Sequence, residues 1–442
     1  SRYMNIDKLE ENSVWKIILA LALPTMIGQL GTILYNMADT YFIGQVNDVN
    51  QVAAISVTMP VFLVLMSLGA LFGIGSASYI SRMMGSKNEH EMKKASAYTF
   101  YILLACGFVF TVLGIVFINP ILSIIGCDTN SWSYSHDYLF IIILGTLAIM
   151  ISNAFAFTLR SVGETKKAMY GLVIGSLLNI ALDPIFILYF HMGVKGAAIA
   201  TVFSNVVTSL LYIYYVQRNV YLSLHFNDVS FAMSLQKEII SIGIPGSLVT
   251  ILLSFSNIIL NNYCVLYGNV AVAAMGIVSK INLFPIQLTV GLGQGIQPLI
   301  GYCVGAKKKD KLKETMKAAN IISLCLGMFF VLIFILMKAV LMQMFIDNEE
   351  VIHSGELFLM IITISTPILG GIFIFSTFFQ SSGLVKPSLF VSVARQGLFY
   401  IPIIMLGNYF FGIKGVIIAQ PISDILCFIV CIRWYRKIMH EA

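Results

Sequence analysis

The sequence predicts an all-α integral membrane protein with twelve transmembrane helices, arranged as two pseudo-symmetric six-helix bundles around a central cleft. Three observations lead to this fold class: an apolar composition, charge-free segments long enough to cross a bilayer, and a second half that repeats the first. Of the 442 residues, 58% are hydrophobic and only 11% are charged, whereas soluble domains carry about 25% charged residues. This balance excludes a soluble domain of this size.

Charge-free intervals recur along the chain, for example at residues 17–38, 95–127 and 239–279. Each is long enough for the roughly 20 residues that cross a bilayer as a helix. Dividing the longer intervals at Gly, Pro and polar clusters gives about twelve spans. We expect them at residues 15–43, 53–80, 95–118, 138–159, 167–189, 195–217, 238–263, 271–302, 316–344, 356–381, 387–409 and 413–435.

The second half of the chain repeats the first. At a constant offset of 220 residues, segment 52–85 aligns with segment 272–305, and "SVGETK" (161–166) aligns with "SSGLVK" (381–386). Because each half holds an even number of spans, both halves have the same orientation and are related by an axis along the membrane normal. We therefore expect an N-lobe at 1–217, a cytoplasmic linker at 218–237 and a C-lobe at 238–442.

The net charge is +6, and the basic residues are unevenly divided between the two sides of the membrane. Of the 27 Lys and Arg residues, 22 lie in the tails and in the loops on one predicted side. The positive-inside rule therefore places both termini in the cytoplasm. The run "AKKKDKLKETMK" (306–317) lies beside a predicted span and belongs to this signal. The expected partner of the basic residues is the lipid bilayer and not nucleic acid.

The sequence contains no pattern typical of a metal centre or a catalytic site. Its seven cysteines are scattered mostly inside apolar runs, with no C-x-x-C motif and no His–Cys cluster. We expect no structural metal, no organic cofactor and no enzymatic activity. Two bundles around a cleft suit alternating access, in which one half rocks against the other. Prolines inside the spans favour a transporter over a rigid channel or scaffold.

Few ionisable residues remain at membrane depth, where a charge costs about 2.5–3.5 kcal/mol on insertion scales. In the first half, Asn179 and Asp183 lie four residues apart on one helical face, and Asp39 and Thr201 converge with them if spans one, five and six meet. Such an all-oxygen set can bind a hard cation such as Na⁺, or hold a proton between two carboxylates that cannot both ionise. The alternative is a structural network that only ties helices together.

The second half carries a different set of charges: Lys280, Arg395 and Asp424. Arg395 and Asp424 can form a buried ion pair with a structural role. Lys280 is expected either to extend its amine towards the interface or to adjust the electrostatic field of the cleft.

Candidate substrate-contacting residues in the first half are Tyr35, Asn36, Met37 and Asn153, because thioethers and aromatic faces suit amphipathic cations. Pro24 and Pro184 are the expected bending points of the first-lobe helices.

Five motifs together resemble the multidrug and toxic compound extrusion (MATE) transporters, in the bacterial DinF-like or MepA-like branch. They are "MADTYFIG" (37–44), "GIGSASYISRMMG" (73–85), "LRSVGETKKAM" (159–169), "NIALDPIFI" (179–187) and "GVKGAAIAT" (193–201). The resemblance implies two six-helix lobes that open as a V and exchange Na⁺ or H⁺ for cationic drugs. It also implies a first-lobe cation site at Asp39, Asn179, Asp183 and Thr201. The other branch's second-lobe acids are absent from residues 239–263 and 357–381.

The expected function is therefore cation-coupled export of cationic, amphipathic drugs by a monomer in the bacterial inner membrane, with Na⁺ and H⁺ both open as the coupling ion. In the outward-open state, the ion would neutralise Asp39 and Asp183 and favour reorganisation of the first lobe. One alternative is a flippase of lipid-linked or other large substrates, which would call for a broadly basic cleft. A membrane-embedded enzyme or a receptor is a further alternative.

Overall fold

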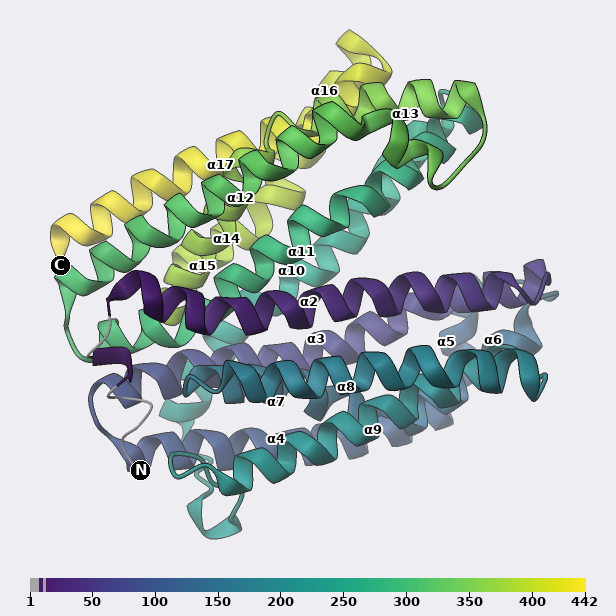
Figure 1. The fold of residues 1–442 in the computed structure, drawn as a ribbon. Helices are drawn as coiled ribbons and strands as arrows, with labels where there is room; N and C mark the ends of the chain where they lie inside the picture. The colour runs from purple at the N-terminus through teal and green to yellow at the C-terminus, as the bar shows by residue number, and fades with distance from the viewer. Residues whose placement is uncertain (1–7, 11–12) are drawn as a thin grey trace.

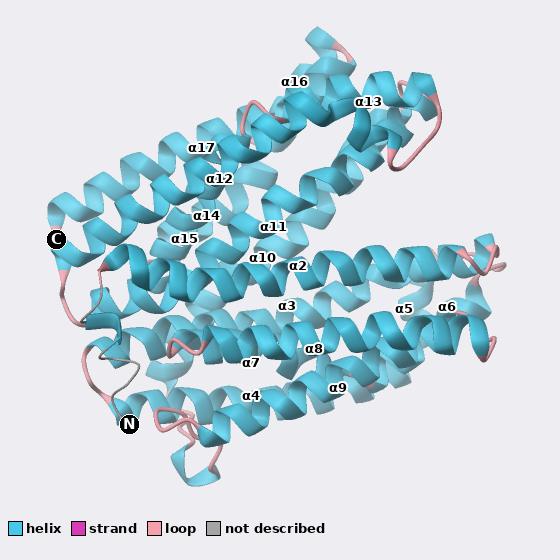
Figure 2. Ribbon diagram, in the orientation of Figure 1, coloured by secondary structure: helices cyan, strands magenta, loops and turns pink. Residues whose placement is uncertain are grey.

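The computed structural model describes residues 8–10 and 13–442, and every regular element in these ranges is helical (Figure 2). Among the described residues, ten helices are long and apolar enough to cross a membrane, and two bent helix pairs raise the number to twelve. The predicted all-α membrane fold is therefore confirmed. The limits of the two lobes stay a prediction, and the first seven residues of the N-lobe lie outside the described part of the chain.

The first bundle follows the apolar segments of the first half. Its elements are α2 (Val14–Gly44), α3 (Val49–Gly85), α4 (Glu89–Val116), α5 (Ile118–Ile124), α6 (Trp132–Leu144), α7 (Thr146–Ser161), α8 (Thr165–Asp183), the π-helical turn η1 (Pro184–Tyr189) and α9 (Val194–Arg218). Polar side chains cap several of these helices. Ser13, for example, accepts a hydrogen bond from the backbone N–H of Lys16 at the start of α2.

The second bundle repeats this order after a short connection that contains a 3₁₀ turn, η2 (Phe226–Asp228). Its elements are α10 (Met233–Val265), α11 (Asn269–Gly305), α12 (Lys309–Gln343), α13 (Glu349–Ile362), α14 (Thr366–Ser381), α15 (Val385–Val393), the π-helical turn η3 (Ala394–Leu398), α16 (Tyr400–Phe411) and α17 (Ile413–Glu441). Helix α10 starts at Met233, before the expected limit at 238, because a helix continues through polar residues beyond the charge-free interval.

The fourth span of each half is bent. Helices α6 and α7 meet at 55°, and α13 and α14 meet at 51°, where single spans at 138–159 and 356–381 were expected. Gly145 occupies the first break, and a Cβ there would lie only 2.6 Å from Val202 on α9. In the second half, Pro367 in the first turn of α14 disfavours a continuous helix, since the ring removes a backbone donor and restricts the preceding residue.

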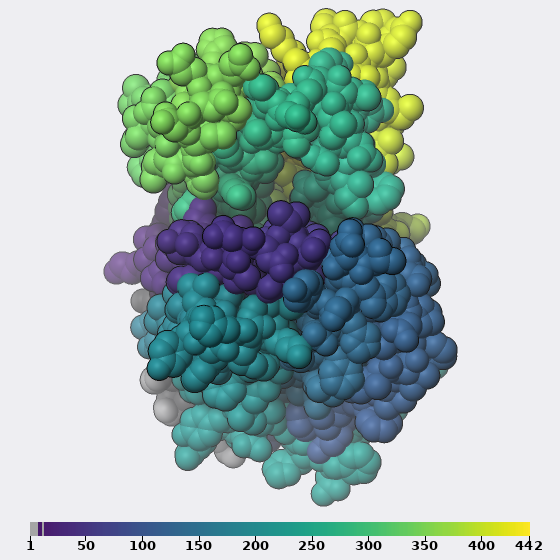
Figure 3. Space-filling model, turned by 90° about the vertical axis from the view of Figure 1, so that its right-hand side faces the viewer, coloured from purple at the N-terminus to yellow at the C-terminus, as the bar shows by residue number. Residues whose placement is uncertain are grey.

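The two bundles form a V (Figure 1). They converge at the end where the chain termini lie, which we call the closed end, and diverge at the opposite, open end. Viewed from the open end, the surface is hollowed between the bundles (Figure 3). This arrangement leaves a central cleft that opens at the end opposite the chain termini (Figure 3).

Glycines allow the bundles to approach closely at the closed end. A Cβ on Gly75 of α3 would lie 1.9 Å from the carbonyl oxygen of Ile239 on α10. Its repeat equivalent, Gly295 on α11, would place a Cβ 2.5 Å from the Cα of Ala22 on α2. Because lipid is as apolar as the helices, close backbone packing of this kind supplies much of the attraction between membrane helices.

Polar side chains also cross between the bundles at the closed end. The hydroxyl of Ser78 donates to the carbonyl oxygen of Gln380 at 2.5 Å, and Nε2 of Gln297 donates to Oγ of Ser81 at 2.8 Å. Arg82 forms a 3.3 Å ion pair with Glu238 on α10. All of these contacts must break if the closed end is to open.

Candidate functional site

Helices α2 and α8 pack against each other along the first bundle and bring their acidic residues together. Small residues line this contact: a Cβ on Gly28 would lie 3.0 Å from Leu172, and one on Gly31 would lie 3.5 Å from Oγ of Ser176. The close approach continues to the last turns of α2, where Asp39 lies. Asp39 therefore faces the end of α8 that carries Asp183.

Asp183 is completely buried at the point where α8 changes from an α-helix to a π-helical turn. The next residue, Pro184, has no backbone N–H and cannot donate within an α-helical turn. Single π-helical turns are frequent at functional sites. The predicted bending point at Pro184 thus coincides with an irregular turn, whereas Pro24 lies inside the continuous helix α2. The role of both prolines as hinges stays a prediction.

The two carboxyl groups lie within hydrogen-bonding distance of each other. One oxygen of Asp39, Oδ1, is buried, and no group in the described part of the chain donates a hydrogen bond to it. Two carboxylates in such contact repel each other unless a proton or a cation lies between them. The pair is therefore built to take up one positive charge.

Asn179 and Thr201 complete the cluster. The side-chain nitrogen of Asn179 lies 3.5 Å from Oγ1 of Thr201 on α9. With the amide turned over, the nitrogen lies 3.2 Å from both carboxylate oxygens of Asp183. In that orientation the amide supports an ionised Asp183. In the first, its oxygen faces the carboxylates and is available to a cation.

Tyr35 lies beside this cluster, because its side chain interacts with those of Thr201 and Asn179. The other predicted substrate-contacting residues differ in position. Asn36 is exposed and Met37 is partly buried, whereas the amide of Asn153 donates to the carbonyl oxygen of Ile149 on its own helix at 2.9 Å. Contact of these residues with substrate stays a prediction.

The cluster offers only oxygen ligands and one amide. Carboxylate, amide and hydroxyl oxygens are the ligands that hard cations prefer, and the same groups can hold a proton. No group of three or more His, Cys, Asp and Glu side chains that would suit a bound metal occurs in residues 8–10 and 13–442. The chemistry of the cluster thus fits a coupling ion better than a resident transition metal.

The second bundle uses its intramembrane charges differently. Nε of Arg395, in the turn η3, lies 2.8 Å from Oδ1 of Asp424 on α17. Asp424 also accepts hydrogen bonds from Ser365 at 3.0 Å and from Gln420 at 2.9 Å. This acid is fully neutralised and fully hydrogen-bonded. Lys280 is exposed on α11, and its expected effect on the interface or on the field of the cleft stays a prediction.

Arg160 is one of the 22 basic residues that the charge distribution assigns to the cytoplasmic side, and its burial is not predicted by the sequence. The structure buries Arg160 in the last turn of α7, with 4% of its surface exposed. One signal was available: the repeat places neutral Gln380 at the equivalent position.

Comparison with known proteins agrees with this architecture. The family model MatE matches the chain twice, at residues 24–185 and 245–406. Multidrug export protein MepA of Staphylococcus haemolyticus (strain JCSC1435) is 32% identical over 422 residues, which cover 95% of this chain and 92% of the relative. MepA of Staphylococcus aureus (strain MSSA476) is also 32% identical, over 423 residues with the same coverage.

Solved structures resemble the whole fold. An outward-facing multidrug resistance MATE family transporter superposes with a TM-score of 0.93 at 25% identity, covering 98% of this chain and 97% of that chain. A MOP superfamily transporter from Pyrococcus furiosus superposes with a TM-score of 0.91 at 25% identity, covering 99% and 98%. These relatives are transporters and not enzymes. With a family model matched in both halves, this chain belongs to the MATE (MatE) family of membrane transporters.

Proposed function

We propose that the protein is a cation-coupled antiporter that exports cationic, amphipathic drugs by alternating access. The coupling ion, Na⁺ or H⁺, binds at Asp39, Asn179, Asp183 and Thr201 in the first bundle. One observation carries this proposal: two acidic side chains meet inside the membrane, beside oxygen ligands, with no basic partner among the described residues. The names of the MepA relatives support drug export as the activity.

The V shape supports the outward-open state as the one described. The closed end carries the termini and the basic loops, so the positive-inside rule assigns it to the cytoplasm. In this state the cleft opens away from the cell and the acid pair is available to an external cation. The protein acts in the bacterial plasma membrane, as a monomer with two lobes.

Ion uptake changes the charge of the first bundle. An entering cation makes the charge of the Asp39–Asp183 pair one unit less negative, weakens its attraction for a cationic drug and favours repacking of α2 against α8. A monovalent cation that moves inwards through the membrane field supplies about 2.3 kcal/mol per 100 mV. That free energy drives the drug outwards when the ion and the drug use the same first-bundle cluster in turn.

Efflux from proteoliposomes tests the proposal. Purified protein is reconstituted with a fluorescent cationic dye, and Na⁺ and pH gradients are imposed one at a time. We expect dye transport under at least one gradient, and transport at the level of empty liposomes for Asp39→Asn and Asp183→Asn. The matched control is Asp137→Asn, which removes an acid that pairs at 3.7 Å with Lys195 in the same bundle. Gradient-driven transport by both cluster variants at the wild-type rate would refute the coupling site.

A further inference from the structure

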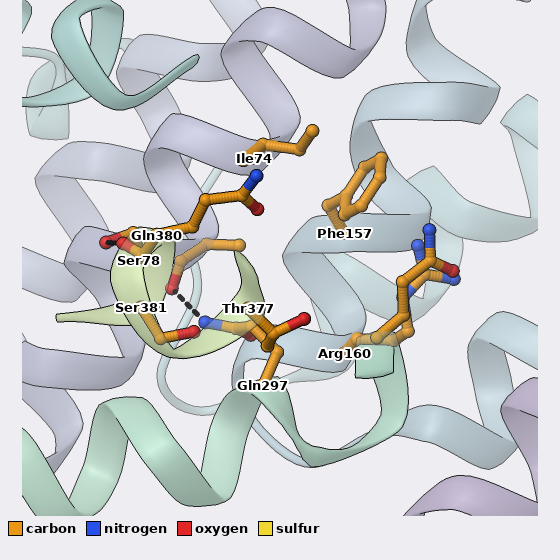
Figure 4. A pocket seen from close by; sticks show the side chains of 10 residues that line it. Ile74, Ser78, Phe157, Arg160, Gln297, Thr377, Gln380 and Ser381 are labelled. Atoms are coloured by element: carbon orange, nitrogen blue, oxygen red, sulfur yellow. Dashed lines mark hydrogen bonds between the residues drawn. The ribbon is translucent and has the colours of Figure 1, made fainter. Parts of the chain in front are cut away.

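A second polar site lies at the closed end, on the axis that relates the two halves. A cavity there is lined by residues from α3, α7, α11 and α14 (Figure 4). Its walls are repeat equivalents at the offset of 220 residues: Ala77 with Gln297, Phe157 with Thr377, and Arg160 with Gln380. The fold is therefore symmetric around this cavity, but its charge is not.

Arg160 places an uncompensated positive charge in this wall. Its side chain is almost completely buried, and its guanidinium carbon lies 4.6 Å from the centre of the Phe157 ring. Within the described part of the chain, Nε of Arg160 has no hydrogen-bond partner and no acidic side chain forms an ion pair with the group. An isolated buried charge costs several kcal/mol, and buried charges are normally paired.

Two neighbouring groups are also unsatisfied. Among the described residues, Oγ of Ser381 on α14 is buried without a hydrogen-bond partner, and so is Oε1 of Gln297. The nitrogen of the Gln297 amide is already engaged by the carbonyl oxygen of Ala77 and by Ser81. The Ser381 hydroxyl is thus a free donor, and the Gln297 oxygen is an acceptor for a water molecule or for the guanidinium.

We propose that this cavity binds one small inorganic anion of halide size at the Arg160 guanidinium, and that a water molecule links this anion to the Ser381 hydroxyl on the opposite wall (Figure 4). The charge requires an anion, since a guanidinium has five donors and no acceptor. The size restricts it: the cavity holds about 30 Å³, whereas one water needs roughly 10–15 Å³ on this measure. A drug, a nucleotide or a sugar acid does not fit, but one halide with a water does.

The position of the anion gives it a role. Arg160 belongs to the first bundle and Ser381 to the second, so an anion and its water between them add a contact across the closed end. It joins the Ser78–Gln380 and Gln297–Ser81 hydrogen bonds that already hold the bundles together there. The anion thus stabilises the state in which the closed end is shut. This inference does not depend on the coupling site in the first bundle.

Thermal unfolding of the purified full-length protein tests the proposal. The protein is held in sodium gluconate, and chloride, bromide or nitrate replaces gluconate at constant Na⁺ and ionic strength. We expect a saturable rise in Tm for the wild type with each small anion. Arg160→Gln should show no anion-dependent rise, and its Tm in gluconate should equal or exceed that of the wild type, because the uncompensated charge is gone.

Two further variants sharpen the assignment. Ser381→Ala removes the proposed hydroxyl donor and should raise the half-saturating bromide concentration several-fold. Its repeat equivalent, Ser161→Ala, is the matched control and should titrate like the wild type, because Ser161 donates to the carbonyl oxygen of Thr158 instead. Glutamine is chosen at position 160 because the fold already holds Gln380 at the equivalent place. An equal bromide response in Arg160→Gln and the wild type overturns the proposal.

Crystals of the wild type grown in bromide give a measurement that needs no variant. We expect an anomalous bromide peak beside the Arg160 guanidinium, and its loss when bromide is exchanged for gluconate. Absence of a bromide peak there, or density for a protein carboxylate against Arg160, contradicts the proposal even if Arg160→Gln fails to fold.

Discussion

The acid cluster of the first bundle and the ion pair of the second lie in bundles that are related by the repeat, but their acids have different partners. Asp183 meets another acid, whereas Asp424 meets Arg395 at 2.8 Å and two further donors. Each lies next to a π-helical turn, η1 or η3. The repeated fold thus provides two irregular sites, of which one is neutralised within the protein and the other needs a cation from outside.

This difference indicates how the two halves of a duplicated fold can take different roles, with ion coupling in the first bundle and structural stabilisation in the second. A buried acid with a fixed basic partner stays ionised in every conformational state, so it does not bind and release a coupling ion. A buried acid pair without a partner changes its net charge whenever a cation arrives. Two variants, one in each bundle, should therefore give opposite results in transport and in stability.

The largest effect is expected on transport, where Asp183→Asn should reduce gradient-driven dye export to the level of empty liposomes. Asp424→Asn should retain export once the rate is divided by the amount of folded protein. The reason is that only the first acid exchanges its positive partner during the cycle. The comparison breaks if Asp424→Asn loses export while its folded fraction stays normal, because the second bundle would then also take part in coupling.

The effects of the same two variants on the free energy of unfolding should have the opposite order, with the larger loss in Asp424→Asn. Asp424→Asn leaves the Arg395 guanidinium buried without its counter-charge, and breaking a buried pair from one side costs about 3–5 kcal/mol. Asp183→Asn removes a charge from a crowded acid pair and should leave Tm unchanged or raised. Thermal unfolding in detergent measures both. The double variant Arg395→Gln/Asp424→Asn should recover part of the loss, since neither side is left charged.

The sequence was sufficient for the spans, the duplication and the residues of both intramembrane clusters. Hydropathy and charge report directly which segments enter the membrane, and helical spacing brings Asn179 and Asp183 onto one face. The bends at Gly145 and before Pro367, and the π-helical turns, were not predicted because they depend on contacts with neighbouring helices. Tyr35 was predicted to contact substrate, which stays a prediction, and the structure places its side chain beside Thr201 and Asn179.

Arg160 shows that a count of basic residues on each side of the membrane does not reveal which of them are buried. It ends α7 near a basic loop, so the sequence alone favours a position at the interface. Its burial follows from the packing of four helices around the axis, which no local pattern encodes. Only the contrast with Gln380 at the repeat-equivalent position indicated that this arginine has another role.

A smaller effect is expected where α11 of the second bundle crosses α2 of the first. Gly295→Ala should destabilise the described state by about 1–3 kcal/mol, because overpacking of this size shifts backbone and side chains, and here the methyl group meets the backbone of Ala22 at 2.5 Å. Gly276→Ala is the matched control on the same helix, because among the described residues no atom of another helix lies within 4 Å of the added Cβ. Cysteine cross-linking across the closed end should slow in the first variant only. Equal cross-linking in both would mean that the crossing tolerates a methyl group without separating the bundles.

The smallest effect is expected for Asp48, an acid outside the membrane. It tests whether hydrogen-bond donors alone, without burial, make the contribution of an acid to protein stability depend on pH. Asp48 precedes α3, and its carboxylate accepts hydrogen bonds from the Gln51 side chain at 3.1 Å and from the backbone N–H of Asn50 at 3.0 Å. These bonds, with that from Gln51 the larger, hold the pKa of Asp48 below its usual value of about 3.8. A lowered pKa contributes stability that is present above the ordinary value and lost as pH falls through the folded one. Asp48→Asn, which can still cap the helix, should therefore flatten the Tm–pH curve slightly below about pH 4. A curve identical to that of the wild type would mean that these exposed hydrogen bonds are replaced by water at no cost.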